Sequence, residues 1–444
     1  MRTLFLTVGL IVTALSSQAA KPNIVMILVD DLGYSDLSSF GGTDIQTPAI
    51  DTLMNSGLRF DQFYSNCTVC TPTRASLLTG RYPDIVGAPG VIRQWDKDSW
   101  GYFKPTGPTL PELMRKAGYH TGMVGKWHLG FESPNIPNDR GFDFFHGFLA
   151  DMMDDYWTHL RGGVNWMRLN KEEVKPKGHA TEVFTRWAID YIKEQTADKK
   201  QPFFLYLAYN APHFPIQPPK DWLEKVQKRE PQLNKKRATN VAFVEHMDHE
   251  IGKFLDAVNE LGIAKDTLIV FSSDNGGSIP HGALNGKLRG GKQDHWEGGI
   301  RVPTCAVWPG TIPVGRTSAL GITMDLLPTF CEIAGANVKH KIDGQSLANV
   351  LLKGGKGDPR RTLVFVRREG NRRYQGRAYY AIRKGPWKLL QNNPFEPMKL
   401  VNLEKDPAEE KPLPLNSKIA NELTRTLMDH IQKAGATPWR KPNR

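Results

Sequence analysis

The sequence predicts an α/β fold, with a large, mixed but mostly parallel β-sheet sandwiched between helices and a smaller C-terminal α+β subdomain built on a short antiparallel sheet. Runs that are apolar on both faces alternate with helical patterns, as expected for parallel strands that helices cover on both sides. After about Gly355 the pattern changes to short strands, a Gly-Pro turn and one closing helix. A chain of 444 residues also exceeds the usual size of a single core.

Individual elements follow from these patterns. Four apolar runs predict buried strands at 23–29, 121–124, 203–209 and 267–273. Two amphipathic stretches predict helices at 180–195 and 243–262. In the C-terminal part, antiparallel strands are expected in "TLVFVR", "AYYAIRKGPWKLLQ" and "MKLVNLE", and a helix in "SKIANELTRTLMDHIQKAG". Gly435 is expected to end that helix.

The chain is expected to have three parts: a signal peptide at 1–19, a large α/β domain at 20–355 and the C-terminal subdomain at 356–444. The start, "MRTLFLTVGLIVTALSSQAA", has an arginine, an apolar run and small residues, which is typical of a secretory signal. The run is shorter than the roughly 20 residues of a spanning helix. We therefore expect an exported protein, periplasmic or extracellular, without a membrane span.

Basic residues are concentrated near the C-terminus. Residues 356–444 carry 20 basic and 9 acidic side chains, a net charge of +11, whereas the whole chain carries +12. A basic surface attracts polyanions. Because export is expected, a sulfated polysaccharide is favoured over nucleic acid as the partner. A solvated cationic face with no dedicated partner is the alternative.

Acidic and amide side chains follow two of the predicted strands. Asp30 and Asp31 come after the first strand, and Asp274 and Asn275 come after the strand at 267–273. Ligands of open α/β sheets gather at the carboxyl ends of strands. Oxygen ligands without a soft donor suit Ca²⁺ or Mg²⁺ rather than zinc. Each pair alone is weak evidence, because an acidic pair can simply cap a helix, but the two pairs together predict a site for a hard cation.

Other polar groups follow strand ends as well. "VGKWHLG" places Lys126 and His128 on either side of a tryptophan, and "YNAPHFP" places His213 in a proline-bracketed turn. Lys292 lies in the glycine-rich loop "RGGKQDHWEGG". A lone histidine is more often structural than catalytic. These two histidines, however, enter loops on the side of the sheet where the acids are expected, so both are candidates for catalysis.

The stretch "CTPTRASLLTGR" predicts a helix that begins at Cys70, because Pro72 suits the first turn. A helix N-terminus carries unpaired N–H groups and partial positive charge, which favour an anion. Arg74, one turn on, is placed to brace that anion or Cys70 itself. Together with a divalent cation, two lysines and two histidines, such a site would bind a tetrahedral oxyanion ester and stabilise the charge that develops during its cleavage.

The remaining cysteines, Cys67, Cys305 and Cys331, are too few for a disulfide scaffold. Buried free thiols are expected, with a Cys305–Cys331 pair, or a Cys67–Cys70 pair if Cys70 stays a thiol, left open. The sequon "NCT" at Asn66 lies against the candidate site, so we interpret it as a chance match.

These residues resemble a known family. The motif Cys70-Thr71-Pro72-Thr73-Arg74, followed by "ASLLTGR", is similar to the signature of the type I, formylglycine-dependent sulfatases of the alkaline phosphatase superfamily, among them secreted arylsulfatases and polysaccharide sulfatases. Further motifs in the family's order extend the similarity over nearly the whole mature chain. They are "PNIVMILVDDLGYSDL", "VGKWHLG", "PFFLYLAYNAPHFP", "SSDNGG", "EGGIRVP" and "LVNLEKDP".

The resemblance implies a role for each matching position. A maturation enzyme of formylglycine-generating type would oxidise Cys70 to formylglycine (3-oxoalanine), which hydrates to a gem-diol. The implied metal ligands, for Ca²⁺ in preference to Mg²⁺, are Asp30, Asp31, Cys70, Asp274 and Asn275. The implied catalytic residues are Cys70, Arg74, Lys126, His128, His213 and Lys292. Lys287 competes for the last place, but the spacing from Lys292 to "EGG" fits the family better.

The implied reaction is hydrolysis of sulfate esters of a sulfated carbohydrate, of polysaccharide or glycosaminoglycan type. One hydroxyl of the diol attacks sulfur, and the other then expels sulfate by breaking carbon to oxygen and reforming the aldehyde. We expect His128 to take the diol proton in the second step and His213, aided by Lys292, to protonate the leaving alcohol. A phosphonate monoester or phosphodiester hydrolase and an inactive polyanion-binding relative are the alternatives.

Residues that contact the substrate are expected around this centre. Those assigned to the substrate are Lys126, His213, Lys292, Arg93, His281 and Arg289. Of these, Arg93, His281 and Arg289 lie in loops, as do Trp95, Asp151, Asp154 and Trp157, and each of these seven could equally line the substrate pocket or be a surface or packing residue. Contacts to a longer chain are expected from Arg367, Arg368, Arg372 and Arg373. Neither the sugar nor the oligomeric state follows from the sequence.

Overall fold

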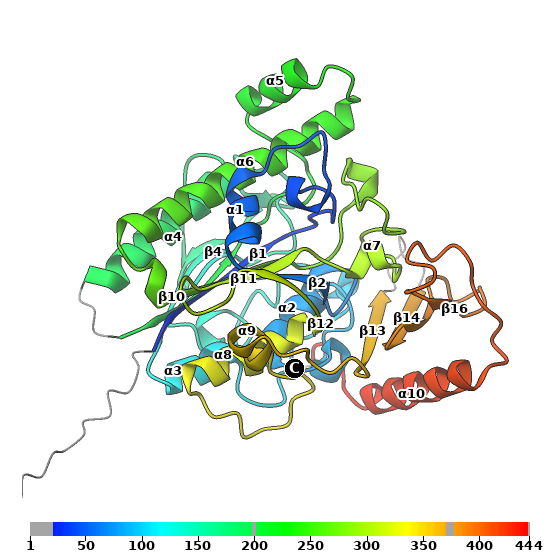
Figure 1. Ribbon diagram of the computed structural model, residues 1–444. Helices are drawn as coiled ribbons and strands as arrows, with labels where there is room; N and C mark the ends of the chain where they lie inside the picture. The colour runs from blue at the N-terminus through cyan, green and yellow to red at the C-terminus, as the bar shows by residue number, and fades with distance from the viewer. Residues whose placement is uncertain (1–20, 198–200, 370–376, 443–444) are drawn as a thin grey trace, which may run out of the picture.

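The computed structural model describes residues 21–197, 201–369 and 377–442. The expected signal peptide at 1–19, together with Arg372 and Arg373, lies outside the described residues. A ten-stranded sheet occupies the centre of the molecule, and a four-stranded sheet with its own helix lies beside it (Figure 1). A two-stranded hairpin, β5 (Leu160–Arg161) with β6 (Val164–Asn165), completes the β-structure of the described residues.

The ten-stranded sheet is mixed but mostly parallel, in the order β12-β2-β11-β10-β1-β9-β3-β4-β7-β8. Its strands are β1 (Asn23–Val29), β2 (Leu58–Tyr64), β3 (His120–Lys126), β4 (Phe144–Phe148), β7 (Met167–Leu169), β8 (Glu172–Glu173), β9 (Phe203–Ala208), β10 (Thr267–Ser273), β11 (Thr304–Val307) and β12 (Gly315–Ile322). The central strands β10, β1, β9, β3 and β4 are parallel, whereas β11 and β7 run antiparallel to their neighbours. The four strands predicted from apolar runs are the adjacent β10, β1, β9 and β3.

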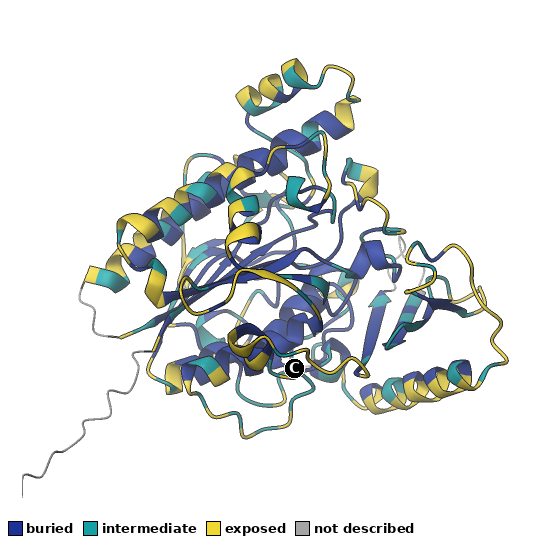
Figure 2. Cartoon of the chain, in the orientation of Figure 1, coloured by how far each residue is buried: buried dark blue, intermediate teal, exposed yellow. Residues whose placement is uncertain are grey.

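Helices cover both faces of this sheet, which confirms the predicted sandwich. One face carries α1 (Pro48–Ser56), α4 (Ala180–Ala197) and α6 (Lys235–Glu260), and α5 (Lys220–Arg229) packs on α6 beyond them (Figure 1). The other carries α2 (Cys70–Thr79), α3 (Leu110–Lys116), α8 (Leu326–Ala334) and α9 (Ala348–Lys353). Side chains of a strand alternate between these faces. Figure 2 shows the buried sheet between the two layers.

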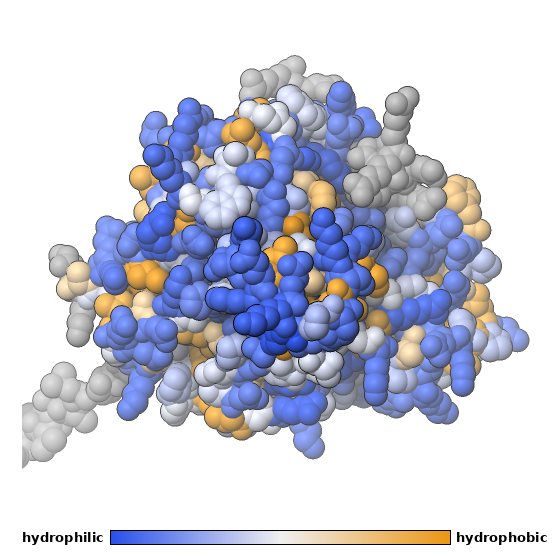
Figure 3. Space-filling view, turned by 90° about the horizontal axis from the view of Figure 1, so that it is seen from above, coloured by the Kyte–Doolittle hydropathy of each residue, from blue (hydrophilic) through white to orange (hydrophobic). Residues whose placement is uncertain are grey.

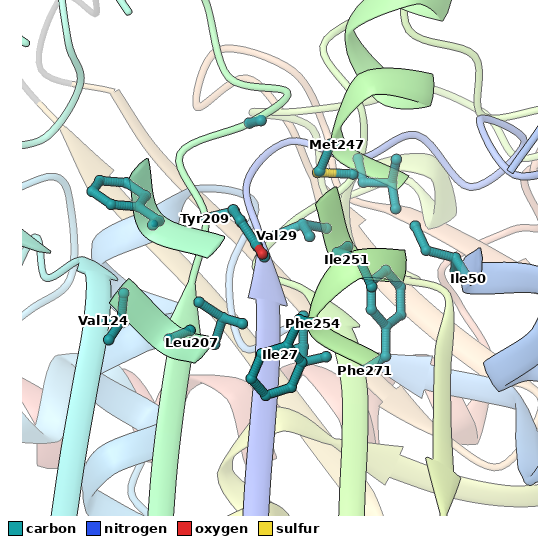
Figure 4. Packing of buried hydrophobic residues seen from close by; sticks show 14 of the residues in the cluster. Ile27, Val29, Ile50, Val124, Leu207, Tyr209, Met247, Ile251, Phe254 and Phe271 are labelled. Atoms are coloured by element: carbon teal, nitrogen blue, oxygen red, sulfur yellow. The ribbon is translucent and has the colours of Figure 1, made fainter. Parts of the chain in front are cut away.

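The core on the α6 face shows how the alternation works. Ile27 and Val29 of β1 point toward α6, where they lie near Ile251 and Phe254 (Figure 4). Met26 of the same strand belongs to the core on the other face.

Viewed from above, the outside of the molecule is mostly hydrophilic with small groups of hydrophobic side chains (Figure 3). In the described part of the chain, no helix combines the length and apolar character needed to cross a membrane.

The second sheet is antiparallel throughout, in the order β13 (Thr362–Glu369), β14 (Arg377–Lys384), β15 (Trp387–Gln391) and β16 (Lys399–Asn402). The closing helix α10 (Lys418–Gly435) packs on one face. The other face packs on the large sheet and on α7 (Glu297–Ile300) through a shared apolar cluster. The predicted domain boundary at 355/356 falls between α9 and β13 and stays a prediction.

Much of the basic C-terminal stretch is internal. The exposed fractions of Arg361, Arg367, Arg383 and Lys388 are 6%, 1%, 7% and 0%. Arg361 pairs with Asp325 and Arg367 pairs with Glu369, both inside the protein. The prediction that Arg367 contacts a polysaccharide is therefore wrong, because its guanidinium is buried against a carboxylate. Counting charges along the sequence could not reveal partners that the fold supplies.

Candidate active site

The candidate residues meet at the carboxyl ends of four central strands. Asp30 directly follows β1, Lys126 ends β3, His213 lies in the loop after β9, and Asp274 directly follows β10. The strands are parallel neighbours, so their carboxyl ends share one edge of the sheet. Helix α2 begins with Cys70 at the same edge, and the Cys70 Sγ lies 3.3 Å from Asp30 Oδ1. The predicted helix start and the predicted strand ends therefore form one site.

Ten residues, which we call the site cluster, make up this centre. They are Asp30, Asp31, Cys70, Arg74, Lys126, His128, His213, Asp274, Asn275 and Lys292. Nine of them are buried, and Lys292 is partly exposed. The cluster thus holds three carboxylates, three permanent cations and two histidines in a nearly water-free space.

The backbone of the site is held in unfavourable conformations. Asp31, His128 and Gln293 have φ angles of 68°, 59° and 79°, in the left-handed region that non-glycine residues rarely adopt. After Asn275, a Cβ on Gly276 would lie only 1.8 Å from Gly298 O, so this position accepts only glycine. Such strain is typical of functional sites, where the surrounding structure compensates for it.

The oxygen atoms of the site are arranged around a shared space. Asp30, Asp31, Cys70 and His213 each offer a ligand atom, and these atoms all lie within 4.8 Å of one another. Asp274 and Asn275 adjoin this group, since Asp31 N lies 3.3 Å from Asp274 Oδ1 and Asn275 Nδ2 donates to Asp31 Oδ1 at 2.8 Å. The Asn275 Oδ1 is buried and has no hydrogen-bond partner. An orphaned buried oxygen beside carboxylates fits a ligand of a hard cation.

Each carboxylate also has a cationic neighbour. Lys126 donates to Asp30, and Lys292 Nζ donates to Asp31 Oδ2 at 2.7 Å. The Arg74 guanidinium donates to Asp274 Oδ2 from Nε at 3.1 Å and from Nη2 at 2.8 Å. The positive charges of the site are therefore held in place by the same carboxylates that are candidates for metal ligation.

The carboxylates nevertheless crowd one another. Burial would raise the pKa of Asp30, but the charges of Lys126, Arg74 and Lys292 outweigh it and hold the pKa far below its usual range. For Asp274, burial and the charge of Asp30 raise the pKa to about 7, although Arg74 opposes this. The negative charge of Asp274 is thus only partly balanced by the cations of the protein, and a bound metal ion would stabilise it.

The two histidines present unprotonated nitrogens. His213 Nδ1 lies 2.6 Å from Phe214 O, so this nitrogen carries the hydrogen, and Nε2 accepts from Lys292 Nζ at 2.9 Å. His128 Nε2 donates in the same way to Ile92 O at 3.1 Å, which leaves its buried Nδ1 unprotonated and without a partner. Burial and neighbouring cations lower the pKa of His213 to about 4 and that of His128 well below its usual value, so both rings are neutral.

The Cys70 side chain is a poor nucleophile as a thiol. Burial and the charge of Asp30 raise its pKa well above the usual value, and the thiol is less nucleophilic than the thiolate. All four cysteines lie in the described part of the chain, and none is disulfide-bonded. Cys305 and Cys331 belong to cores on opposite faces of the sheet. The free-thiol expectation is confirmed.

Other predicted residues lie at the rim or elsewhere. The His281 ring stacks on Phe214, next to His213, with the ring centroids 4.5 Å apart. Lys287 is exposed, so the structure brings Lys292 and not Lys287 to His213. Asn66 is buried and its Oδ1 accepts from Met324 N, so the sequon is inaccessible in the folded chain.

The loop candidates have partners of their own. Arg93 pairs with Glu369 at 2.7 Å, and Arg289 lies over the Trp296 ring beside the C-terminal sheet. Both Asp151 and Asp154 are held by Arg161. Trp157 is exposed and lies edge-on to His179, while Trp95 is exposed on a loop near the site. Among these candidates, His281 lies beside His213 through its stacking on Phe214.

Sequence reasoning missed the residues that anchor the Lys292 loop. Gln293 N donates to Thr68 O at 2.9 Å, and Arg367 Nη1 donates to Gln293 O at 3.2 Å. Glu297 N donates to Glu409 Oε2 at 2.6 Å. Arg367 and Glu409 come from the C-terminal part, 74 and 112 residues away from their partners, so no local pattern could indicate these contacts.

Comparison with known proteins identifies the family. The family described as Sulfatase matches residues 22–336, and the C-terminal domain of N-sulphoglucosamine sulphohydrolase matches residues 291–436. Arylsulfatase A of Bos taurus is 33% identical over 413 residues, which cover 86% of this chain and 77% of that protein. N-acetylgalactosamine-6-sulfatase of Mus musculus is 34% identical over 406 residues, which cover 85% and 74%.

One solved structure is similar in fold to this protein over almost the whole length of both chains. The structure of Ps i-CgsB in complex with k-i-k-neocarrahexaose superposes with a TM-score of 0.85 and 32% identity, covering 95% of both chains. The family match and the similarity of fold therefore agree. The chain belongs to the type I sulfatase family of the alkaline phosphatase superfamily and is a sulfuric ester hydrolase.

Proposed function

We propose that this protein is an exported sulfatase that hydrolyses sulfate esters of a sulfated carbohydrate, with a formylglycine made from Cys70 and a bound Ca²⁺. The main support is the buried position of Cys70 at the start of α2, among carboxylates, permanent cations and two neutral histidines. A carbohydrate substrate is supported by relatives named for N-acetylgalactosamine-6-sulfate hydrolysis and by a neighbour in complex with neocarrahexaose. Export rests on the signal-like sequence at 1–19.

The calcium ion would be held by the oxygen ligands at the two strand ends and by the converted Cys70. The ligands from the strand ends are Asp30, Asp31, Asp274 and Asn275. Their fit rests on the orphaned Asn275 Oδ1 and on the raised pKa of Asp274, because both groups would be stabilised by a bound cation. Ca²⁺ suits such a carboxylate-rich, dehydrated site better than Mg²⁺, which usually keeps several waters. The bound ion would draw negative charge from the sulfate oxygens.

Position 70 needs chemical conversion before it can serve as a nucleophile, because its thiol is buried and neutral. Hydrated formylglycine supplies a diol, of which one hydroxyl can attack sulfur and the other can release the sulfate. Lys126 and Arg74 both contact Asp30, the carboxylate that accepts from Cys70, with Arg74 Nη2 at 3.4 Å. Their positive charges therefore lie beside the reacting side chain and favour the anionic substrate.

The two histidines have different tasks. The unprotonated Nδ1 of His128 is available to take a proton from the hydroxyl of position 70, because Ile92 O occupies its other nitrogen. In the Lys292–His213 pair, the hydrogen bond to Phe214 O makes His213 Nε2 an acceptor, so the shared proton belongs to the Lys292 ammonium. We assign to this pair the protonation of the leaving alcohol of the substrate.

Mass and substrate preference test this proposal together. Protein produced with a formylglycine-generating enzyme is digested, and the peptide that contains Cys70 should weigh about 18 Da less than encoded. The same preparation is assayed with 4-nitrophenyl sulfate and bis(4-nitrophenyl) phosphate, and then with sulfated oligosaccharides of defined linkage. We expect the sulfate ester to have the higher kcat/KM.

Two outcomes would contradict the proposal. A preference for the phosphodiester would identify the protein as a phosphodiester hydrolase with a similar site. An unchanged mass after co-expression, together with no turnover of any ester, would favour a polyanion-binding protein in which Cys70 stays a thiol.

A further inference from the structure

A cavity of about 680 Å³ adjoins the site cluster and has no part in the chemistry proposed above. Ile92 and Leu129 belong to its lining. Ile92 O accepts the hydrogen bond of His128 Nε2, and Leu129 directly follows His128. In addition, Thr71 Oγ1 donates to His128 O at 3.1 Å and accepts from Ile92 N at 3.2 Å. The cavity therefore begins directly behind the candidate base and the first turn of α2, and its volume lies within the roughly 300–1,000 Å³ of ligand pockets.

Aromatic rings form much of the cavity wall. They include Trp95, Trp100, Phe131, Trp166 and Trp439. Trp95 is 56% exposed although it is one of the largest apolar side chains. Trp100 and Trp439 stack with their ring centroids 4.5 Å apart and their planes inclined by 13°. An indole offers a flat apolar face and a polar N–H, which suits a ligand that has both apolar and hydroxyl-bearing surfaces.

Cations are also gathered around this cavity. Arg93, Lys97, Arg440 and Lys441 line it, together with the acids Asp96 and Glu132. The Arg440 guanidinium lies 4.8 Å from the Trp439 ring centroid, and Lys441 pairs with Glu132. The basic groups outnumber the acidic ones, although Arg93 and Lys441 already pair with Glu369 and Glu132. The small excess of positive charge favours an anionic ligand. A ligand with flat apolar faces, hydroxyl groups and negative charge is a sulfated sugar.

The cavity and the Lys292 loop are joined by a chain of hydrogen bonds. Arg93 pairs with Glu369, which also pairs with the buried Arg367. Arg367 Nη1 in turn donates to the carbonyl of Gln293, the residue after Lys292. This chain fixes the position of the cavity wall relative to the candidate acid. A ligand in the cavity would therefore be held in a defined place relative to the reacting sulfate.

We propose that this cavity is a second subsite, which holds a neighbouring sulfated sugar of a polysaccharide while the sulfate to be cleaved lies at Cys70. This rests on the proposed function, because it takes the substrate to be a sulfated carbohydrate. The C-terminal segment 439–441 supplies one wall. Residues 439–441 would thus favour substrates that extend beyond a single sugar.

Chain-length dependence tests the subsite. Wild type is compared with Trp95→Ala and with a chain that ends at Pro438 and so lacks the tail. Phe395→Ala is the matched control, since Phe395 is 84% exposed and does not line the cavity. The substrates are carrageenan and chondroitin sulfate hexasaccharides, the corresponding disaccharides and 4-nitrophenyl sulfate. Both cavity variants should lose about tenfold in kcat/KM on a hexasaccharide, the effect of about one lost contact, and keep wild-type activity on the aryl sulfate.

Binding provides a readout that does not require turnover. Protein made without the maturation enzyme is titrated with the same hexasaccharides and disaccharides while tryptophan fluorescence is recorded. Wild type should bind a hexasaccharide more tightly than a disaccharide, and Trp95→Ala should abolish that difference. The chain that ends at Pro438 should behave in the same way, whereas Phe395→Ala should match wild type.

The possible failures are distinguishable. Equal affinity of wild type for hexasaccharides and disaccharides would overturn the subsite, as would equal losses on hexasaccharide and aryl sulfate in both cavity variants. Either result leaves the sulfatase proposal intact as long as 4-nitrophenyl sulfate is cleaved. Protein that carries formylglycine and cleaves no sulfate ester would instead refute the proposed function.

Discussion

The segment from Lys292 to Glu297 joins two clusters of buried charge that differ in character. At its start is the site cluster. At its end is an interface cluster between the two sheets, formed by Tyr64, Glu297, Arg383, Lys388 and Glu409. Both clusters contain carboxylates and lysines removed from water, and both are assembled from residues far apart in the sequence. Their comparison shows which features distinguish a reactive site from a structural one.

The two carboxylates of the interface cluster share one lysine, although burial and the charge of Glu297 still raise the pKa of Glu409 above its usual value. Lys388 Nζ lies 3.0 Å from Glu297 Oε1 and 2.8 Å from Glu409 Oε1, and Tyr64 Oη donates to Glu297 Oε2 at 2.6 Å. Burial would raise the pKa of Glu297, but the charges of Lys388, Arg383 and Arg301 outweigh it and lower the pKa to about 2. This cluster bridges the two sheets, because Tyr64 belongs to β2 and Arg383 and Lys388 belong to β14 and β15.

The site cluster is incomplete and partly open. The Asn275 Oδ1 and His128 Nδ1 are buried without partners, and the pKa of Asp274 is raised to about 7. The Lys292 side chain is 15% exposed, so solvent reaches one edge of the cluster. Buried charge alone therefore does not identify a catalytic centre. A crowded carboxylate with a raised pKa occurs in both clusters, whereas the opening to solvent and the unpartnered Asn275 Oδ1 and His128 Nδ1 distinguish the site cluster. Variants of the two clusters should therefore fail in different ways.

The largest effect is expected from Cys70→Ala. Loss of the nucleophile's precursor should lower kcat about 10⁶-fold, as removal of a nucleophile does in other hydrolases. The melting temperature should change little, because Sγ makes one hydrogen bond. Rates with 4-nitrophenyl sulfate and calorimetric melting measure both quantities. Cys67→Ala is the control and should keep its turnover, and a Cys70→Ala enzyme of normal activity would remove position 70 from the mechanism.

A smaller loss of activity is expected from Lys292→Ala. Removing the ammonium that donates to His213 should cost about 10²–10³ in kcat, the usual effect of losing one positioned donor. Lys287→Ala, on the same loop but exposed, is the matched control. If the two variants lost the same activity, the distinction between these lysines would be wrong.

The interface cluster should affect stability instead. Lys388→Met leaves two buried carboxylates without their shared cation and should cost about 3–5 kcal/mol of unfolding free energy, measured with urea. Lys126→Met should be less destabilising, because Asp30 keeps Arg74 at 3.4 Å, but should lose most activity. If Lys388→Met and Lys126→Met showed the same ratio of activity loss to stability loss, the distinction between the interface cluster and the site cluster would be wrong.

Metal removal should affect only the site cluster. Dialysis against a chelator should abolish turnover, and Ca²⁺ at about 100 times its Kd should restore it and stabilise the fold by about 2.7 kcal/mol. Asn275→Ala should raise the Ca²⁺ concentration that is needed. Lys388→Met should not, once both proteins are assayed well below their melting temperatures. If the melting temperature did not change when Ca²⁺ is added, the proposed Ca²⁺ site would be wrong.

The smallest expected effect is on acid stability. The folded pKa of Glu297, about 2, lies below its usual value of 4.5. This group therefore contributes stability that is present above about pH 4.5 and lost as the pH falls toward 2. Glu297→Gln should remove that contribution, so its unfolding free energy should fall less than that of wild type between pH 6 and pH 3. Parallel curves for the two proteins would show that Glu297 is not the responsible group.

Part of this fold was predictable because its signals are local. The apolar runs at 23–29 and 267–273 coincide with β1 and β10, since strands buried on both faces must be continuously apolar. The strands β2, β11 and β12 were not predicted. β2 and β12 contain polar residues such as Arg59 and Arg316, and β11 has only four residues. Helix α6 begins at Lys235 and not at 243, because its polar first turns lack the apolar periodicity on which the prediction relied.

The sequence by itself determined the central strands, the helix that begins at Cys70 and the polar residues placed at strand ends. Each of these depends on neighbours a few positions away, and parallel pairing then brings the strand ends together. Only the tertiary structure decided that Arg367 and Lys388 are internal counter-ions and that Trp439 stacks on Trp100 in the wall of a cavity. These contacts join segments that local propensity does not connect, so they exist only once the chain has folded.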